Sequence, residues 1–148
     1  MNIKEQLQAD LITAMKTHDE TKKWVVKMIK AAIQLAEVAK GKELEQEEIL
    51  ALIQKEIKTR HETRADAEKA GREELMAQAD QEIACLKTYL PAQLSEEELK
   101  DLVRNVIAQC GASSLKDMGI VMKTLQPILA GRASNAEASR VVREFLTG

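Results

Sequence analysis

The stretch from residue 89 to residue 99 constrains the fold most, because a helix stop and a helix start lie only four residues apart in it. Pro91 has no backbone N–H and disfavours the α region at the preceding residue, so a helix that arrives here must end. Ser95 and Glu98 have the spacing of a capping box, in which each side chain accepts a hydrogen bond from the backbone amide of the other. The chain is therefore predicted to divide here into two helical parts.

The composition limits the kind of core that these parts can have. Of the 148 residues, 45% are hydrophobic but only 2% are aromatic, so the core must consist of aliphatic side chains, methionine and alanine. Such residues favour helices over sheets. We predict an all-α fold, with an N-terminal bundle of about four helices over residues 1–91 that includes a long protruding helix pair. A small three-helix subdomain is predicted over residues 92–148.

Apolar spacing locates the first helices. Ile3, Leu7, Leu11 and Met15 recur every four residues, which predicts an amphipathic helix with these side chains on its buried face. A second helix is predicted to end at Lys40 and Gly41, and a third to begin near Gln46.

The segment Lys58–Glu74 is polar, but its residues are good helix formers and include no proline. We expect the third helix to continue through it without a core, as a free rod or as the tip of a helical hairpin broken at Gly71. Arg60 and Arg64 would form a basic spot on a solvated surface.

The second part repeats one type of helix start. Ser114 with Asp117, and Ser134 with Glu137, have the same spacing as the pair at residues 95 and 98. Pro127 is expected to kink or end the middle helix. From residue 102 onward, six basic residues stand against three acidic ones. The basic residues are Arg104, Lys116, Lys123, Arg132, Arg140 and Arg143, and the acidic ones are Asp117, Glu137 and Glu144. A solvated face is the common reason for such an excess, but it could also contribute phosphate contacts.

No catalytic, metal-binding or cofactor-binding motif is found in the sequence. His18 and His61 are expected to be exposed rather than general bases, and Cys85 and Cys110 to be reduced thiols in a helical core. Gly119 within a helix indicates a close approach, for which packing against a neighbouring helix is favoured over a ligand phosphate. The absence of a long apolar run and of a signal-peptide pattern predicts a cytoplasmic protein with no membrane contact.

Several short motifs resemble the GatB/YqeY family, in the same order along nearly the whole chain. They are Ile29–Ile33, Gln54–Lys58, Lys69–Arg72, Tyr89–Pro91, Gln93–Leu99, Gly111–Ser114 through Asp117–Gly119, and Gly131–Ala133. The resemblance is to a free-standing YqeY-type protein. It implies a helical protein of two subdomains, related to the tail domain of the B subunit of the tRNA-dependent amidotransferase.

That enzyme amidates misacylated Glu-tRNA or Asp-tRNA with glutamine as the nitrogen donor, and in the family its tail helps to hold the tRNA. The chain resembles only the tail, so the resemblance implies no amidotransferase activity of its own, although the family is associated with carbon–nitrogen ligase chemistry. It implies tRNA contacts at Lys116, Gly119, Lys123, Gly131 and Arg132, to which the local charge adds Arg140 and Arg143. Family members usually have lysine where Ile120 and Ile128 stand here.

Two functions follow as expectations. The first is an accessory protein that binds tRNA, or an amidotransferase–tRNA complex, through the basic last helices. The second is a protein-interaction adaptor in which the polar segment Lys58–Glu74 contacts a partner.

Overall fold

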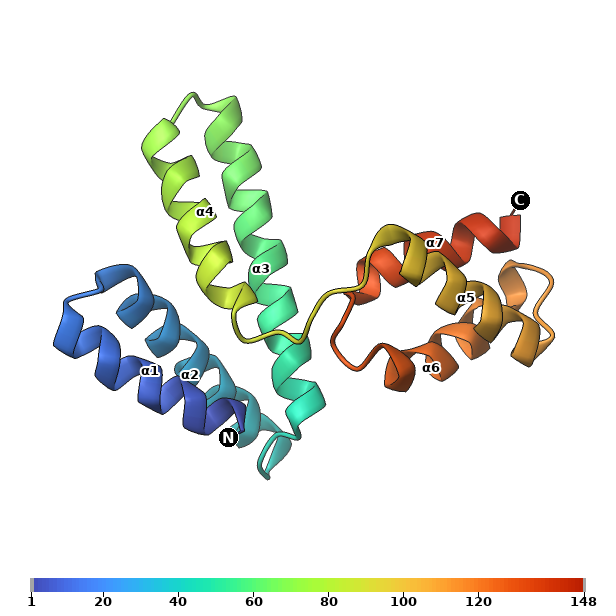
Figure 1. Ribbon diagram of the computed structural model, residues 1–148, viewed down its shortest axis with the longest axis horizontal. Coiled ribbons are helices and arrows are strands. Elements are labelled where there is room, and N and C mark those ends of the chain that lie inside the picture. Colours follow the sequence, from blue (N-terminus) through green and yellow to red (C-terminus); the bar gives the residue numbers. More distant parts are fainter. Residues whose placement is uncertain (1, 148) are drawn as a thin grey trace. The chain divides into compact units, whose positions relative to one another are not determined.

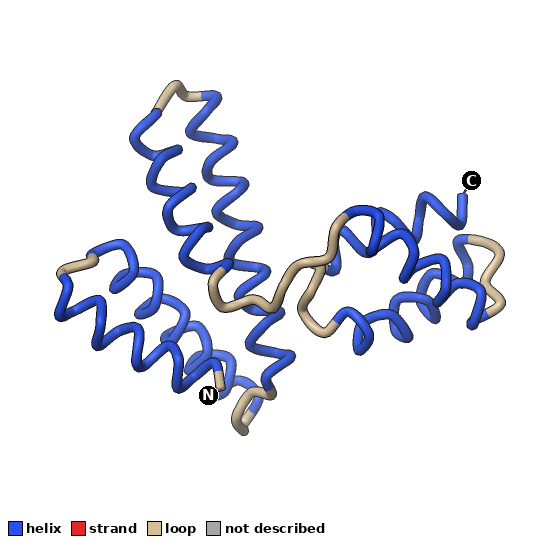
Figure 2. Tube along the Cα trace, viewed as in Figure 1, coloured by secondary structure: helices blue, strands red, loops and turns tan. Residues whose placement is uncertain are grey.

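The computed structural model describes residues 2–147 and confirms the all-α prediction (Figure 1). These residues form seven α-helices and one short 3₁₀ turn, and no strand occurs among them (Figure 2). The chain has two compact units, Met1–Leu90 and Pro91–Gly148, which we call the first and second unit. None of the described helices is both long and apolar enough to cross a membrane.

Four helices make up the first unit as two antiparallel hairpins, with these bounds: α1 (Ile3–Thr17), α2 (Glu20–Lys40), α3 (Gln46–Lys69) and α4 (Glu73–Lys87). His18 ends α1 in the left-handed region at φ 57°, and Asp19 caps α2 by accepting from the backbone amide of Lys22 at 3.1 Å. Gly41 ends α2, as predicted. The core of this unit is aliphatic apart from one tyrosine, with these members: Ile3, Leu7, Val25, Val26, Ile29, Ile33, Ile49, Leu50, Ile53, Ile57, Ile83, Leu86 and Tyr89.

The α3–α4 hairpin contains the polar segment of the sequence. The turn between the two helices includes Gly71, whose φ of 68° is strained for other residue types, so the segment is a hairpin tip and not a free rod. The expected solvated surface is wrong at Arg60, which is only 7% exposed. Ala67 is buried as well, because α4 covers this side of α3.

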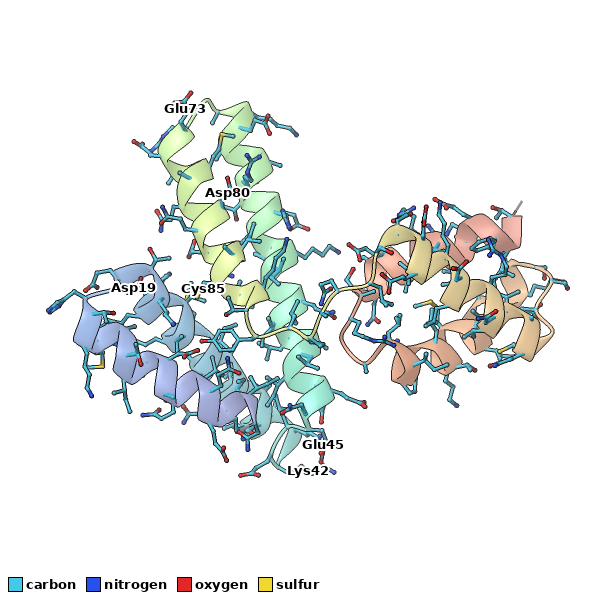
Figure 3. The ribbon with its side chains drawn as sticks, in the orientation of Figure 1. Asp19, Lys42, Glu45, Glu73, Asp80 and Cys85 are labelled. Carbon is cyan, nitrogen blue, oxygen red and sulfur yellow. The ribbon has the colours of Figure 1, made fainter. Side chains whose placement is uncertain are left out.

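Arg60 joins three helices of the first unit. Its Nη1 donates to Glu56 Oε2 at 2.6 Å, its Nη2 donates to Met28 Sδ at 3.4 Å, and its Nε lies 3.7 Å from Glu82 Oε1. Nε is the one buried side-chain nitrogen or oxygen of the described residues that has no hydrogen-bond partner. The expected basic spot is therefore neutralised, since Arg64 also contacts a carboxylate, that of Asp80, at 2.7 Å (Figure 3).

Tyr89 closes the core of the first unit just after α4. Its ring is buried, and its hydroxyl donates to Asp10 Oδ2 of α1 at 2.5 Å. Burial and this hydrogen bond raise the pKa of Tyr89. The last residues before Pro91 are thus fixed to α1.

Three helices and a 3₁₀ turn make up the second unit, with these bounds: α5 (Glu96–Cys110), η1 (Leu115–Asp117), α6 (Met118–Leu129) and α7 (Asn135–Thr147). Their buried faces form a second core, with these members: Leu99, Val103, Val106, Val121, Leu125, Leu129, Ala133, Ala138, Val141, Val142 and Leu146.

Capping boxes start α5 and η1, and ahead of α7 Ser134 Oγ accepts from the Glu137 amide at 3.1 Å. Ser95 Oγ accepts from the Glu98 amide at 3.1 Å, and the Glu98 carboxylate accepts from the Ser95 amide at 3.3 Å, as the sequence predicts. Ser114 and Asp117 form a second box. Pro127 lies inside α6, which continues for two more residues to Leu129, so this proline does not end the helix.

Candidate nucleic-acid interface

Three of the predicted RNA-binding residues share the exposed side of η1 and α6. Lys116 lies in η1, and Gly119 and Lys123 follow it at intervals of three and four residues, which is the spacing of one helix face. All three residues are exposed, whereas Val121 and Leu125 on the opposite face are buried in the core. The capping box of Ser114 and Asp117 fixes where this face begins.

Gly119 lies in open space. A Cβ atom placed on it would meet no other atom within 4 Å, so the expected packing of this glycine against a neighbouring helix is wrong. Ile120, beside it, is 60% exposed, and Leu115 is 50% exposed. The surface around Gly119 therefore combines two lysines with exposed aliphatic side chains.

Arg143 lies on the flank of α7 that faces α6. Ser139 on α7 donates to Met122 Sδ on α6 at 3.9 Å, and Arg143 follows Ser139 by four residues, on the same side of the helix. Lys116, Lys123 and Arg143 have no carboxylate within ion-pair distance among residues 2–147. The charges of these three residues are therefore not compensated locally, and they define what we call the α6 face.

Arg140 differs because its charge is compensated. Its guanidinium donates to both carboxylate oxygens of Glu96 at 2.7 and 3.0 Å, and to Glu144 at 2.9 Å. The hydrogen bond from Arg140 lowers the pKa of Glu96, and the carboxylates of Glu96 and Glu144 raise the pKa of Arg140. This arginine joins α7 to the start of α5 and carries little free charge for a phosphate.

Arg132 and Gly131 form the turn between α6 and α7. The Arg132 guanidinium donates to the carbonyl oxygens of Ile128 at 2.8 Å and Leu129 at 3.2 Å, so it caps the end of α6. Ala130 and Gly131 both have positive φ angles, of 47° and 81°. The turn is thus held by its own backbone and by one arginine.

The segment before α5 is bound to this turn, which sequence reasoning did not predict. The Leu94 amide donates to the Arg132 carbonyl at 2.9 Å, and Gln93 Nε2 donates to the Gly131 carbonyl at 3.1 Å. Two motifs that lie far apart in the sequence, at residues 93–99 and 131–133, therefore meet in one place. Spacing alone could not have paired them, because each is only a local turn pattern.

A comparison with known protein families shows which family this chain belongs to. The model of the family described as "Yqey-like protein" matches residues 4–146, which is nearly the whole chain. The chain belongs to the Yqey-like protein family. This family is related to the C-terminal tail of GatB. No curated protein matches the sequence.

His18, His61 and Cys85 of this Yqey-like chain belong to the first unit. Among residues 2–147, no three His, Cys, Asp or Glu side chains are grouped so that they could hold a metal ion. His18 and His61 are both exposed. Cys85, shown with Asp19 in Figure 3, lines an open hollow of about 460 Å³ between α2 and α4, and burial raises its pKa. A raised pKa keeps the thiol protonated and so disfavours a nucleophilic role.

Proposed function

We propose that this protein is a tRNA-binding accessory protein, acting on tRNA or on a tRNA–amidotransferase complex. Two observations support the proposal: membership of a family related to the GatB tail, and the α6 face with its three uncompensated cations. The open space at Gly119 is the observation that carries it, because a ribose–phosphate backbone could lie against the helix there between Lys116 and Lys123.

Within this proposal the protein supplies binding and no chemistry. The carbon–nitrogen bond would form in the partner enzyme, which takes the amide nitrogen from glutamine. Arg140 and Arg132 would shape the second unit, since their guanidinium groups are occupied by carboxylates and by helix carbonyls. Lys116, Lys123 and Arg143 would make the phosphate contacts.

The test is binding of bulk tRNA to the whole protein across a salt series. The plot of log K against log[salt] has a negative slope, and each lost phosphate contact makes it shallower by about 0.9. Lys116→Glu with Lys123→Glu should therefore reduce the magnitude of the slope by about 2. The matched control carries the same change of charge in α3, as Lys55→Glu with Lys58→Glu, and should retain the slope. The proposal would be refuted if the protein bound no tRNA at low salt, or if the salt slope became equally shallow in the α6-face variant and in the α3 control.

A second candidate function is a protein-interaction adaptor that uses the tip of the α3–α4 hairpin. The observation that favours it is the exposure of the whole turn from residue 68 to residue 75, including Leu75, where polar side chains surround one apolar residue. Replacing residues 66–76 with a short glycine-containing turn should abolish binding to an amidotransferase subunit if this function holds, and should leave it unchanged if it does not.

A further inference from the structure

The α1–α2 hairpin has an apolar groove on the side that α3 and α4 leave uncovered. The groove has a volume of about 490 Å³ and is lined by Leu7, Leu11, Ala31 and Ile33, by Gln34, and by Lys4, Lys27, Lys30 and Glu37. We call it the α1–α2 groove. It lies in the first unit, whereas the α6 face lies in the second.

Exposed apolar side chains are concentrated on the two helices that form the groove. Of the nine large hydrophobic side chains that are exposed among residues 2–147, five lie on α1 and α2: Ile12, Met15, Trp24, Leu35 and Val38. Met15 follows Leu11 by one turn, so the apolar stripe predicted from the sequence of α1 runs out of the core and into this surface. Such a concentration of exposed apolar side chains is typical of an interaction site.

The apolar positions of α2 have the spacing of a helix-packing seam. Trp24, Ala31 and Val38 recur every seven residues, and Leu35 lies between the last two; Leu35 and Val38 are each 74% exposed. The small side chain of Ala31 in the middle would let a second helix approach closely. A regular pattern of this length fits a helix better than it fits an extended peptide.

The charges around the groove indicate what kind of helix would fit. The negative charge of Glu37 is already compensated within the hairpin. Its carboxylate accepts one hydrogen bond from the Lys4 ammonium and one, at 2.9 Å, from the Leu44 amide. Lys27 and Lys30 have no carboxylate within ion-pair distance in the described part of the chain, and Lys30 donates only to the neutral Gln8 side chain. Lys27 and Lys30 therefore give the groove a positive rim beside Ala31.

We propose that the α1–α2 groove binds an amphipathic helix of another protein, one with an apolar stripe flanked by aspartate or glutamate. The stripe packs on Leu11 and Ala31, which are the lining apolar side chains that are not buried, and the flanking carboxylates pair with Lys27 and Lys30. A second copy of this hairpin fits less well, because packing through Ala31 would bring Lys30 of one copy close to Lys30 of the other. RNA fits less well because the floor of the groove is aliphatic.

The probe is a synthetic helical peptide of about 18 residues, with leucine along one face and glutamate on both flanks. Two matched peptides serve as controls: one with lysine in place of glutamate, and one with the acidic composition scrambled so that no stripe remains. Binding to the whole protein is measured by fluorescence anisotropy of labelled peptide. Trp24, the single tryptophan of the chain, gives a second signal, since coverage should shift its emission to shorter wavelength.

The proposal expects only the acidic striped peptide to bind with micromolar affinity. Lys27→Glu with Lys30→Glu should weaken binding at least tenfold, and so should Ala31→Glu, which leaves both lysines in place. Lys116→Glu with Lys123→Glu has the same change of charge on the other unit and should bind the peptide normally. Circular dichroism of each variant shows whether the helices remain intact.

Three outcomes would overturn the proposal: no binding of the acidic peptide at low salt, equal binding of all three peptides, or equal loss in the groove and α6-face variants. Binding of tRNA or of anionic lipid vesicles that is lost only in the groove variants, without peptide binding, would assign the groove to that ligand instead. The result is independent of the proposed tRNA function, which is tested by the α6-face variant.

Discussion

Arg60 is the residue whose environment departs most from its chemical type. It is buried between α2, α3 and α4, close to the carboxylates of Glu56 and Glu82, and its Nε has no hydrogen-bond partner. Removing one member of a buried ion pair leaves the other charges uncompensated, at a cost of about 3 kcal/mol. We expect Arg60→Ala to lower the free energy of unfolding by about that amount in urea denaturation.

The control variant for Arg60 removes the positive charge of Arg60 and the negative charge of Glu82 together. In Arg60→Met with Glu82→Met no unpaired charge is created at Glu82, and the two thioether side chains fill much of the same volume. This double variant should be more stable than Arg60→Ala. If it is equally unstable, an uncompensated charge at Glu82 is not what destabilises Arg60→Ala.

Gly119 gives a prediction that separates stability from binding. Alanine is favoured over glycine in a helix by up to about 1 kcal/mol, and the added Cβ would meet no atom of the protein. Gly119→Ala should therefore raise the melting temperature. If RNA lies against this helix, the same variant should bind tRNA more weakly, and the larger Gly119→Leu more weakly still; unchanged tRNA affinity in both would place the RNA elsewhere.

At these two positions the sequence alone was misleading for a physical reason. Arg60 pairs with Glu56, its neighbour at i,i+4 spacing, but its burial depends on α4, which is distant in the sequence. Gly119 lies within α6, and whether anything approaches it is a matter of tertiary structure. Local rules describe neighbours in the chain and cannot describe neighbours in space.

At the scale of helices, the capping pattern at Ser95 was predictable and gives a direct test. Its hydroxyl accepts from the Glu98 amide at the start of α5, where three glutamates also occupy the first turn. Removing such a cap costs about 1 kcal/mol. Ser95→Ala should destabilise the protein by that amount, whereas Ser95→Asp, which retains an acceptor, should have little effect; equal losses in the two variants would contradict the capping role.

Helix boundaries were predictable because they depend on a few adjacent residues. The starts of α5 and η1 and the end of α2 all agree with their caps. Pro127 does not end α6, which has two more residues, whereas the kink that was the other expectation stays a prediction. The contact of Gln93 and Leu94 with the turn at Gly131 and Arg132 was not predictable, because nothing in either motif specifies the other.

At the scale of the whole molecule, the ion pairs predict sensitivity to acid. Hydrogen bonds from lysine or arginine lower the pKa of Glu37, Glu48 and Glu96, which lie in both units. In the unfolded chain these carboxylates take up protons near pH 4.5, while in the folded chain they stay ionised to lower pH. The unfolded state therefore binds more protons, and stability falls as the pH falls below about 5.

The measurement is the melting temperature between pH 7 and pH 3. Glu96→Gln removes one of the three groups and should reduce the drop in melting temperature over this range, although it also removes the ion pair with Arg140 at neutral pH. Glu97→Gln, in the same helical turn but outside that pair, should follow the unmodified protein. An identical pH profile for all three proteins would show that this ion pair does not contribute to acid sensitivity.

For the molecule as a whole, the sequence predicts the class of fold well and the candidate site only in part. Composition and periodicity are sufficient for an all-α chain, because helix formation is largely local. The seven candidate RNA-binding residues remain a prediction, but the structure sorts them by environment: Lys116, Lys123 and Arg143 are uncompensated, whereas Arg132 and Arg140 are engaged in hydrogen bonds. That distinction depends on partners such as Glu96, which is 44 residues away from Arg140.

The two half-buried free thiols give the molecule a practical property. Cys85 belongs to the first unit and Cys110 to the second, and the chain contains no other cysteine. A maleimide dye on each would make a donor–acceptor pair without any engineered residue, although the raised pKa of Cys85 slows its alkylation at neutral pH. Energy transfer between the dyes would then follow, in real time, whether adding tRNA or the acidic peptide moves one unit with respect to the other.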